Sequence, residues 1–392
     1  MSISSTIHLT RIVNKPSLDH AEMRRQRIKS VERLRGLLAQ DDCIANRYEK
    51  ITDMSKRIRA SEYHVTSACN IRCKGCWFFE YGHDKEVNDE KSDSNWRGFI
   101  EKETTNRRIN CALIIGGEPS MFIDRLRLFR EKFKYVTVST NGYKRIPMGE
   151  LSDVAIGITL FGGGVLDDDL RAIKPSGRRF TGLFDIALEN YKNDPRAGFV
   201  YALTEDGISH IEETVKRIHE NRNSVTFNFY SKYGVDDVSS RSTANELLAE
   251  AMRVKLLYPD TVLSTPYYIN TIITGRSHWG SFGYDECPSI SVDHVAHVRR
   301  KQNGNPYLPL FNAWSSDLNT IKFCCTSGHC NGCRDSQAVF SWLLVNAHQF
   351  TNSLDDFKLW LDTSESYWRQ FIWSQFNKNY SNVCRLENSG HM

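Results

Sequence analysis

Short apolar runs alternate with longer charged stretches between residues 62 and 230 of this 392-residue chain. The apolar runs have the length of buried strands, and the stretches between them carry apolar residues at helical spacing. Six strands that alternate with helices predict parallel pairing with right-handed crossovers, as in α/β proteins. The predicted strands cover residues 62–66, 112–115, 135–139, 154–160, 199–203 and 225–230, and the helices between them include 95–103, 122–133, 180–191 and 209–221.

The two ends of the chain depart from this alternation. Residues 17–40 form an amphipathic helical pattern with a basic face, which Ser17 can cap. Beyond residue 235 a helix over 244–257 is expected. Two further helical patterns follow, and we expect most of their tryptophans to pack in the core, with a substrate lid as the alternative: Trp342, Trp360, Trp368 and Trp373. The expected parts are a helical extension (1–60), an α/β unit (61–235) and an α-rich, cysteine-rich region (236–392).

Composition narrows the class of protein only mildly. A hydrophobic content of 40% is ample for a core, and a net charge of +4 does not by itself indicate a nucleic-acid or membrane partner. The eleven cysteines are an odd number and mostly cluster, while Cys43 and Cys111 stand alone. This pattern argues against a secreted disulfide framework and predicts a reducing, cytoplasmic location. No stretch approaches the length of a membrane span.

Three cysteines lie within eight residues of the segment HVTSACNIRCKGCWFFE, which spans residues 64–80. Cys69, Cys73 and Cys76 have the spacing C-x3-C-x2-C, and an aromatic residue follows the last one. Thiolates grouped in this way are metal ligands, and a cubane cluster requires four of them. Three local thiols therefore predict a [4Fe–4S] cluster with one iron left open. The alternatives are a Cys3His zinc site that uses His64 or His83, or a redox-active pair formed by Cys73 and Cys76.

This cysteine motif, placed directly after a predicted strand, resembles the signature of the radical S-adenosylmethionine (radical SAM) enzymes. The resemblance implies a partial (β/α)6 TIM-like barrel with its chemistry at the C-terminal ends of the strands. It also implies that SAM binds the open iron through its amino and carboxylate groups. An electron from the cluster, supplied by a flavodoxin- or ferredoxin-type donor, then cleaves SAM to a 5′-deoxyadenosyl radical.

A second motif, GGEP, follows the second predicted strand, forty residues after Cys76. Gly116 and Gly117 lack a Cβ and let the backbone approach a ligand closely. The Glu118 carboxylate suits a cationic amine, and Pro119 fits the first turn of a helix. The motif resembles the GGEP motif of the radical SAM family, which implies that it holds the amino group of SAM.

Two further strand ends carry candidate SAM contacts. Ser139 and Asn141 belong to the sequence STNG after the third strand, where hydroxyl and amide groups can hydrogen-bond a ribose or a carboxylate, although Asn-Gly is also a common turn. The resemblance implies contacts near the SAM ribose, and it makes Thr159, on the fourth strand, a further contact. Other candidates stay open, because a solvated loop or an outward-facing position is the alternative for each: Arg171, Lys174, Arg178, Arg179, Tyr201, Thr204, Asn228 and Tyr230.

A second group of cysteines lies in the last third of the chain. Cys325, Cys330 and Cys333 have the spacing C-x4-C-x2-C, and the fourth ligand could be Cys287 or Cys324, with His329 and Cys384 as weaker options. The arrangement resembles the twitch and SPASM auxiliary-cluster regions of radical SAM enzymes, although the full SPASM ligand set is missing. It implies a second [4Fe–4S] cluster, with a structural zinc site as the alternative.

Together these motifs predict a radical SAM enzyme that oxidises, or forms a bond in, a small-molecule or peptide substrate. A redox-neutral epimerase or mutase is one alternative. Modification of RNA is another, favoured by the basic N-terminal helix although no RNA-binding module is recognisable. A zinc-stabilised binding protein without catalysis is the non-enzymatic alternative.

Overall fold

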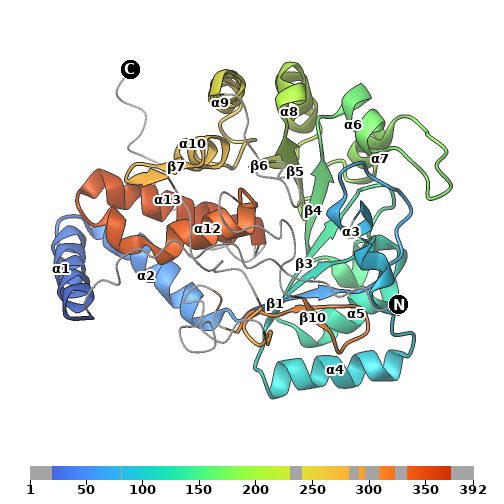
Figure 1. Cartoon of the computed structure of the whole chain (residues 1–392), viewed down its shortest axis with the longest axis horizontal. Helices are drawn as coiled ribbons and strands as arrows, with labels where there is room; N and C mark the ends of the chain where they lie inside the picture. The colour runs from blue at the N-terminus through green and yellow to red at the C-terminus, as the bar shows by residue number, and fades with distance from the viewer. Residues whose placement is uncertain are drawn as a thin grey trace, which may run out of the picture.

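Six parallel strands form the centre of the computed structural model, which describes residues 20–80, 82–229, 241–281, 291–295, 308, 310–322 and 333–371. They follow each other in chain order, so each strand pairs with the next one (Figure 1). The predicted α/β fold with six strand–helix units in an open barrel is thereby confirmed. The strands are β1 (Ala60–His64), β2 (Cys111–Ile115), β3 (Tyr135–Thr140), β4 (Ala155–Leu160), β5 (Ala197–Leu203) and β6 (Ser224–Phe229).

Helices cover the outer face of this sheet, as the alternating pattern predicted. They are α4 (Asp93–Thr105), α5 (Ile123–Lys132), α6 (Gly164–Arg171), α7 (Leu183–Asn190) and α8 (Ile211–Glu220). The short helix α3 (Trp77–Glu80) lines the cavity at the strand ends instead. Short 3-10 segments connect several elements: η1 (His83–Lys85), η2 (Pro119–Met121), η3 (Gly149–Leu151), η4 (Glu205–His210) and η5 (Ala347–Phe350).

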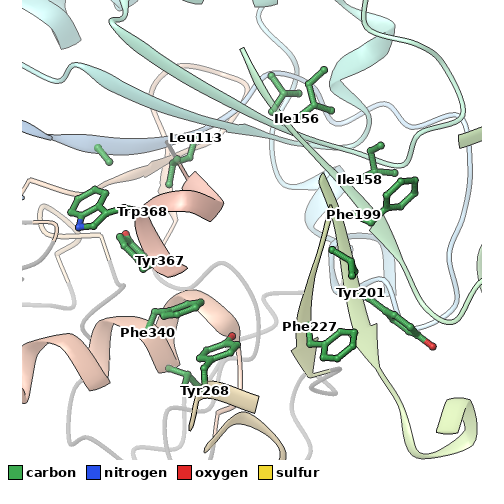
Figure 2. Close-up of a cluster of buried hydrophobic side chains, with 14 of the residues drawn as sticks. Leu113, Ile156, Ile158, Phe199, Tyr201, Phe227, Tyr268, Phe340, Tyr367 and Trp368 are labelled. Atoms are coloured by element: carbon green, nitrogen blue, oxygen red, sulfur yellow. The ribbon is translucent and has the colours of Figure 1, made fainter. Parts of the chain in front are cut away.

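Alternation along the strands separates a packed face from a cavity face. In β3 and β4, buried residues alternate with partly exposed ones, so Val138 and Ile158 pack outward while Ser139 and Thr159 face inward. The outward residues form the core that Figure 2 shows around Ile158, Phe199, Tyr201 and Phe227. Each fully buried side chain of this kind contributes about 1.5–3 kcal/mol to folding. The inward positions are smaller or polar, which leaves room for a ligand.

The C-terminal helices pack against the N-terminal ones and against α10. Helix α13 contacts both α2 and α10, and the Phe340 and Tyr268 rings stack with centroids 4.0 Å apart (Figures 1 and 2). Trp342, Trp360 and Trp368 are buried in this region, as core packing predicted, and Trp373 lies outside the described residues. The helices are α1 (His20–Leu38), α2 (Asp42–Arg57), α9 (Arg241–Leu257), α10 (Pro266–Thr274), α12 (Ser336–Val345) and α13 (Leu354–Phe371).

Short C-terminal strands extend the sheet beyond β1. β9 (Ala313–Trp314) pairs in parallel with β1, and β10 (Ile321–Lys322) pairs antiparallel with β9. β7 (Arg276–Ser277) and β8 (Gly280–Ser281) form a separate hairpin. The backbone N–H of Glu62 donates to the carbonyl of Asn312 at 2.8 Å. β1 is therefore an inner strand of the sheet. Among the described residues, none of the helices has the length and apolar character needed to cross a membrane.

Candidate active site

A cavity of about 430 Å³ lies at the C-terminal ends of the parallel strands. Nearly all the residues that were predicted from the sequence to hold the first cluster and SAM line this cavity: Cys69, Cys73, Cys76, Gly116, Gly117, Glu118, Ser139, Asn141 and Thr159. Pro119 is buried at the start of η2 and does not line the cavity, which fits its predicted role as a first-turn residue. Motifs up to ninety residues apart in sequence thus meet at one site of the size that small-molecule ligands occupy.

The loop that carries the three cysteines is anchored at both ends. At its start, the Asp89 carboxylate accepts hydrogen bonds from Thr66 Oγ1 (2.6 Å) and from the backbone N–H of Ser67 (2.8 Å). Further along, the N–H groups of Arg72 and Lys74 each donate to carbonyls at the end of α6 and just after it, at 2.7 Å. These bonds fix the loop before any metal binds. Asp89 was not predicted, because no spacing rule links it to the cysteines.

The two glycines of the GGEP motif allow the cysteine loop to lie against the end of β2. A Cβ at Gly116 would come 2.6 Å from Thr66 O, and one at Gly117 would come 2.1 Å from Ala68 O. Gly116 also has φ +143°, a conformation that L residues rarely adopt. The sequence predicted that these glycines admit a ligand. The contacts show that they admit the backbone of the loop that precedes Cys69.

Glu118 is buried, and its carboxylate is held by three hydrogen bonds. Oε1 accepts from Thr140 Oγ1 (2.6 Å) and from the backbone N–H of Ser120 (2.9 Å), while Oε2 accepts from the backbone N–H of Asn141 (2.8 Å). A carboxylate offers about four lone-pair sites, so one acceptor position on this cavity-lining group stays available for an amine. The same bonds tie the GGEP motif to the end of β3.

Asn141 connects β3 to the cysteine loop. Its side-chain amide donates to Asn70 Oδ1 at 2.7 Å and lies 3.9 Å from Cys69 Sγ, while its Oδ1 accepts from the backbone N–H of Tyr143 at 2.9 Å. This amide orients the loop as well as facing the cavity. Ser139 and Thr159 face the cavity from neighbouring strands, as the alternation of side chains requires.

The three thiols are half-buried, and their environment disfavours the free thiolate. Burial raises the pKa of Cys69 to about 12 and that of Cys73 to about 11, and it also raises the pKa of Cys76. The Arg171 guanidinium beside Cys73 acts in the opposite direction on its pKa. A bound metal would replace the thiol proton and supply the positive charge that burial withholds.

Four basic residues after the fourth strand were left open as candidate ligand contacts: Arg171, Lys174, Arg178 and Arg179. Of these, only Arg171 lines the cavity. It is buried, and its Nη1 donates to both Asp167 oxygens at 3.2 and 3.1 Å. Lys174 donates to Tyr143 OH at 2.7 Å, and Arg179 pairs with Asp169 in an exposed position. On β6, Asn228 lines the cavity, whereas Tyr201 on β5 packs outward against Phe227.

Neither candidate histidine joins the cysteines. His64 is buried against Trp77 and Phe78, and burial together with Lys322 and His83 keeps its pKa well below the usual value. His83 Nδ1 lies 2.7 Å from Glu86 Oε1. Within the part of the chain that the structure describes, no three His, Cys, Asp or Glu residues are grouped to hold a single metal ion. Thiolates of a cubane need not converge on one ion, because they share four irons.

The predicted auxiliary site is largely outside the described residues. Cys287, Cys324, Cys325 and Cys330, together with His329 and Cys384, belong to segments that the structure does not describe. Cys333 is described and is buried just before α12. Cys43, which is isolated from the other cysteines in the sequence, is disulfide-bonded, whereas Cys111 is a buried free thiol in β2.

Replacement of Asp89 by Asn is expected to loosen the start of the cysteine loop, because an amide in its place retains only one of the two acceptor oxygens. The pKa of Asp89 is below its usual value. Burial acts to raise this pKa, but the hydrogen bonds from Thr66, Ser316 and Ser67 have the larger combined effect and lower it. The carboxylate therefore contributes stability above the unfolded pKa of about 3.9, and this contribution is lost as pH falls through the lower folded value. Urea unfolding at pH 7 and at pH 3 measures it: D89N should lower stability at pH 7 and much less at pH 3. An equal loss at both would contradict this account.

Several solved structures are similar to this chain, whereas no protein-family model and no curated protein sequence matches it. Native anSMEcpe with bound AdoMet and Cp18Cys peptide has a TM-score of 0.46 at 14% identity, covering 81% of this chain and 99% of that one. Hexahistidine-tagged anSMEcpe with bound AdoMet has a TM-score of 0.42 at 16% identity, covering 56% of this chain and 67% of that one. The FeFe-hydrogenase maturase HydG from Carboxydothermus hydrogenoformans has a TM-score of 0.34 at 12% identity, covering 89% and 90%. Likenesses at this level do not establish an activity.

Proposed function

We propose that this chain is a radical SAM enzyme that oxidises, or forms a bond in, a small-molecule or peptide substrate. One observation carries the proposal: the three cysteines, the GGEP motif and the polar ends of β3 and β4 all line the same cavity. The spacing of the cysteines alone would also suit zinc. Their meeting with a buried carboxylate and with hydroxyl and amide groups supports a site for an amino-acid-bearing nucleoside such as SAM.

The residues present fit the proposed cofactors. Cys69, Cys73 and Cys76 would hold the [4Fe–4S] cluster, and Glu118 has one acceptor position left for the SAM ammonium. When bound, the cluster and SAM supply a 5′-deoxyadenosyl radical that abstracts a hydrogen atom from the substrate. The chain orients these groups and keeps water away from them. Apolar side chains on the cavity wall serve that purpose: Ile71, Phe79, Leu113 and Val200.

The auxiliary cluster remains part of the proposal. Cys287, Cys330 and Cys333, with one of Cys324 and Cys325, would hold a second [4Fe–4S] cluster, because two adjacent cysteines are poorly placed to bind one cubane together. A structural zinc ion is the competing assignment. We also propose a flavodoxin- or ferredoxin-type electron donor and a cytoplasmic location. Five described cysteines are free thiols, which favours a reducing compartment, whereas the disulfide at Cys43 is the observation against it.

Anaerobic reconstitution with iron and sulfide tests the proposal. The protein is expected to be brown and to form 5′-deoxyadenosine from SAM when dithionite is the reductant. If it holds two clusters it should bind about eight irons per chain, and if it holds one cluster about four. Cys76→Ala should lose about four irons and all 5′-deoxyadenosine formation. Cys111→Ala, which removes a buried thiol outside the cavity, is the matched control and should keep both. A colourless protein that binds zinc, or intact SAM under reductant, would overturn the proposal.

A further inference from the structure

The cavity has a second polar surface, which the proposed cofactor site does not use. We call it the polar wall. It consists of Glu62 on β1, Asn228 on β6, Gln337 in the first turn of α12 and Gln370 near the end of α13, all of which line the cavity. Each contributes a buried atom without a hydrogen-bond partner: Glu62 Oε1, Asn228 Oδ1, Gln337 Nε2 and Gln370 Oε1.

Contacts around the start of α12 fix the position of Gln337 in the polar wall. β1 and β6 are the first and last of the six parallel strands, and the N-terminus of α12 lies close to both. Asp335 caps α12 by accepting from the backbone N–H groups of Gln337 (3.1 Å) and Ala338 (3.3 Å). Arg334 donates to Ile273 O at 2.7 Å, and its guanidinium lies 4.6 Å from the Phe229 ring. The position of Gln337 is therefore set by neighbours on both sides.

Unpartnered polar atoms at this depth indicate a ligand. Glu62 is only 5% exposed and Gln337 only 8%. Leaving one such group unsatisfied costs about 1–3 kcal/mol, and most buried polar groups have partners. Glu62 Oε1 lies 3.4 Å from His64 Nε2, but these two atoms do not form a hydrogen bond. A bound molecule would supply the missing partners.

The carboxyl groups decide the charge of that molecule. A side-chain amide can present either its oxygen or its nitrogen after a half turn. Asn228, Gln337 and Gln370 therefore indicate that the bound molecule is polar, but not whether it is positively or negatively charged. Burial raises the pKa of Asp335 to about 6, and the negative charge of Glu62 contributes to this rise. Burial raises the pKa of Glu62 to about 7, although the positive charge of Lys322 lowers it. A cation in the cavity would compensate for this burial.

We infer that the polar wall is the substrate subsite and selects a substrate with a protonated amine beside a hydrogen-bond acceptor, as in an amino acid, an aminoacyl group or a peptide N-terminus. This inference rests on the proposed function. An ammonium has three donors for the acceptors of Glu62, Asn228 and Gln370, while the Gln337 amide donates to the neighbouring carbonyl of the substrate.

Binding to the reconstituted holoenzyme with SAM tests this inference, measured by saturation-transfer NMR and calorimetry. Three probes of similar size differ in charge: glycinamide is cationic, N-acetylglycinamide is neutral and N-acetylglycine is anionic. Glycinamide is expected to bind about tenfold or more tightly than the other two. Equal binding of the neutral probe, or preference for the anionic one, would overturn the inference.

Two isosteric variants test the residues. Glu62→Gln is expected to weaken glycinamide binding about tenfold, and Asn228→Asp to tighten it, because the two changes alter the negative charge in opposite directions. Glu101→Gln, which changes an exposed carboxylate paired with Lys132, is the control. If N228D fails to tighten binding, or if E62Q weakens SAM binding as much as glycinamide binding, the wall does not select an amine. Iron content and SAM cleavage of the unaltered enzyme test the proposed function separately.

Discussion

Gly117→Ala is expected to abolish iron binding and SAM cleavage, although it adds only one methyl group. The new Cβ would lie 2.1 Å from Ala68 O and 2.5 Å from Ala68 C, and both are backbone atoms of the cysteine loop. Interiors are close-packed, so the loop must move away and the thiols that follow it lose their arrangement. Iron content after anaerobic reconstitution should fall to about a tenth or less of the unaltered protein's, and 5′-deoxyadenosine formation with it.

Gly98→Ala is the matched control, because nothing lies within 4 Å of a Cβ at that position in α4. There the change should stabilise the helix by about 0.5–1 kcal/mol and leave iron binding intact. Normal iron content in G117A would show that the loop adapts, and the GGEP glycines would then lose their structural explanation.

Arg196→Ala should cause the largest loss of stability, about 3–5 kcal/mol, because it breaks a buried ion pair and leaves several acceptors unsatisfied. Arg196 donates to Asp194 Oδ2 at 2.6 Å. It also donates to three backbone carbonyls in the connection between β3 and β4: Ile146 O, Pro147 O and Leu151 O. Both side chains of the pair are almost fully buried. Urea unfolding at pH 7 measures the effect.

The exposed pair between Arg97 and Glu131 provides the comparison. Replacement of Arg97 by Ala should cost no more than about 1 kcal/mol, since exposed ion pairs are screened by solvent. Similar unfolding midpoints for R196A and R97A would show that the buried pair carries no special weight in this fold.

Local patterns were enough to predict the strands. All six were found within two residues of their predicted limits, because most of them are apolar runs bounded by turn residues. Helix α10 was missed inside an aromatic segment, although Thr265 caps it, Pro266 occupies its first turn and Gly275 ends it. The two-residue strand β9 could not be predicted, because it is very short and it pairs with β1, which lies about 250 residues earlier, as well as with the equally short β10.

The candidate site was predictable where a motif links residue type to spacing, as for Cys69 or Glu118. Asp89 and Gln337 have no such link, and only the fold brings them to the loop and the cavity. Glu62 did carry a signal, since a carboxylate inside a buried strand is costly unless it has a partner. The sequence could not show that Glu62 Oε1 has no hydrogen-bond partner or that it lines the cavity, because both depend on distant parts of the chain.

The pairing of β1 with β9 has a consequence for how the protein is made. The N–H of Asn312 donates to the Ser61 hydroxyl, and these residues are 251 positions apart. At a ribosomal rate of about 5–20 residues per second, the outer edge of β1 waits roughly ten to fifty seconds for its neighbour. An unpaired strand edge invites association with other chains. We therefore expect nascent chains of this protein to need protection from association, for example by chaperones, until the last third has been translated.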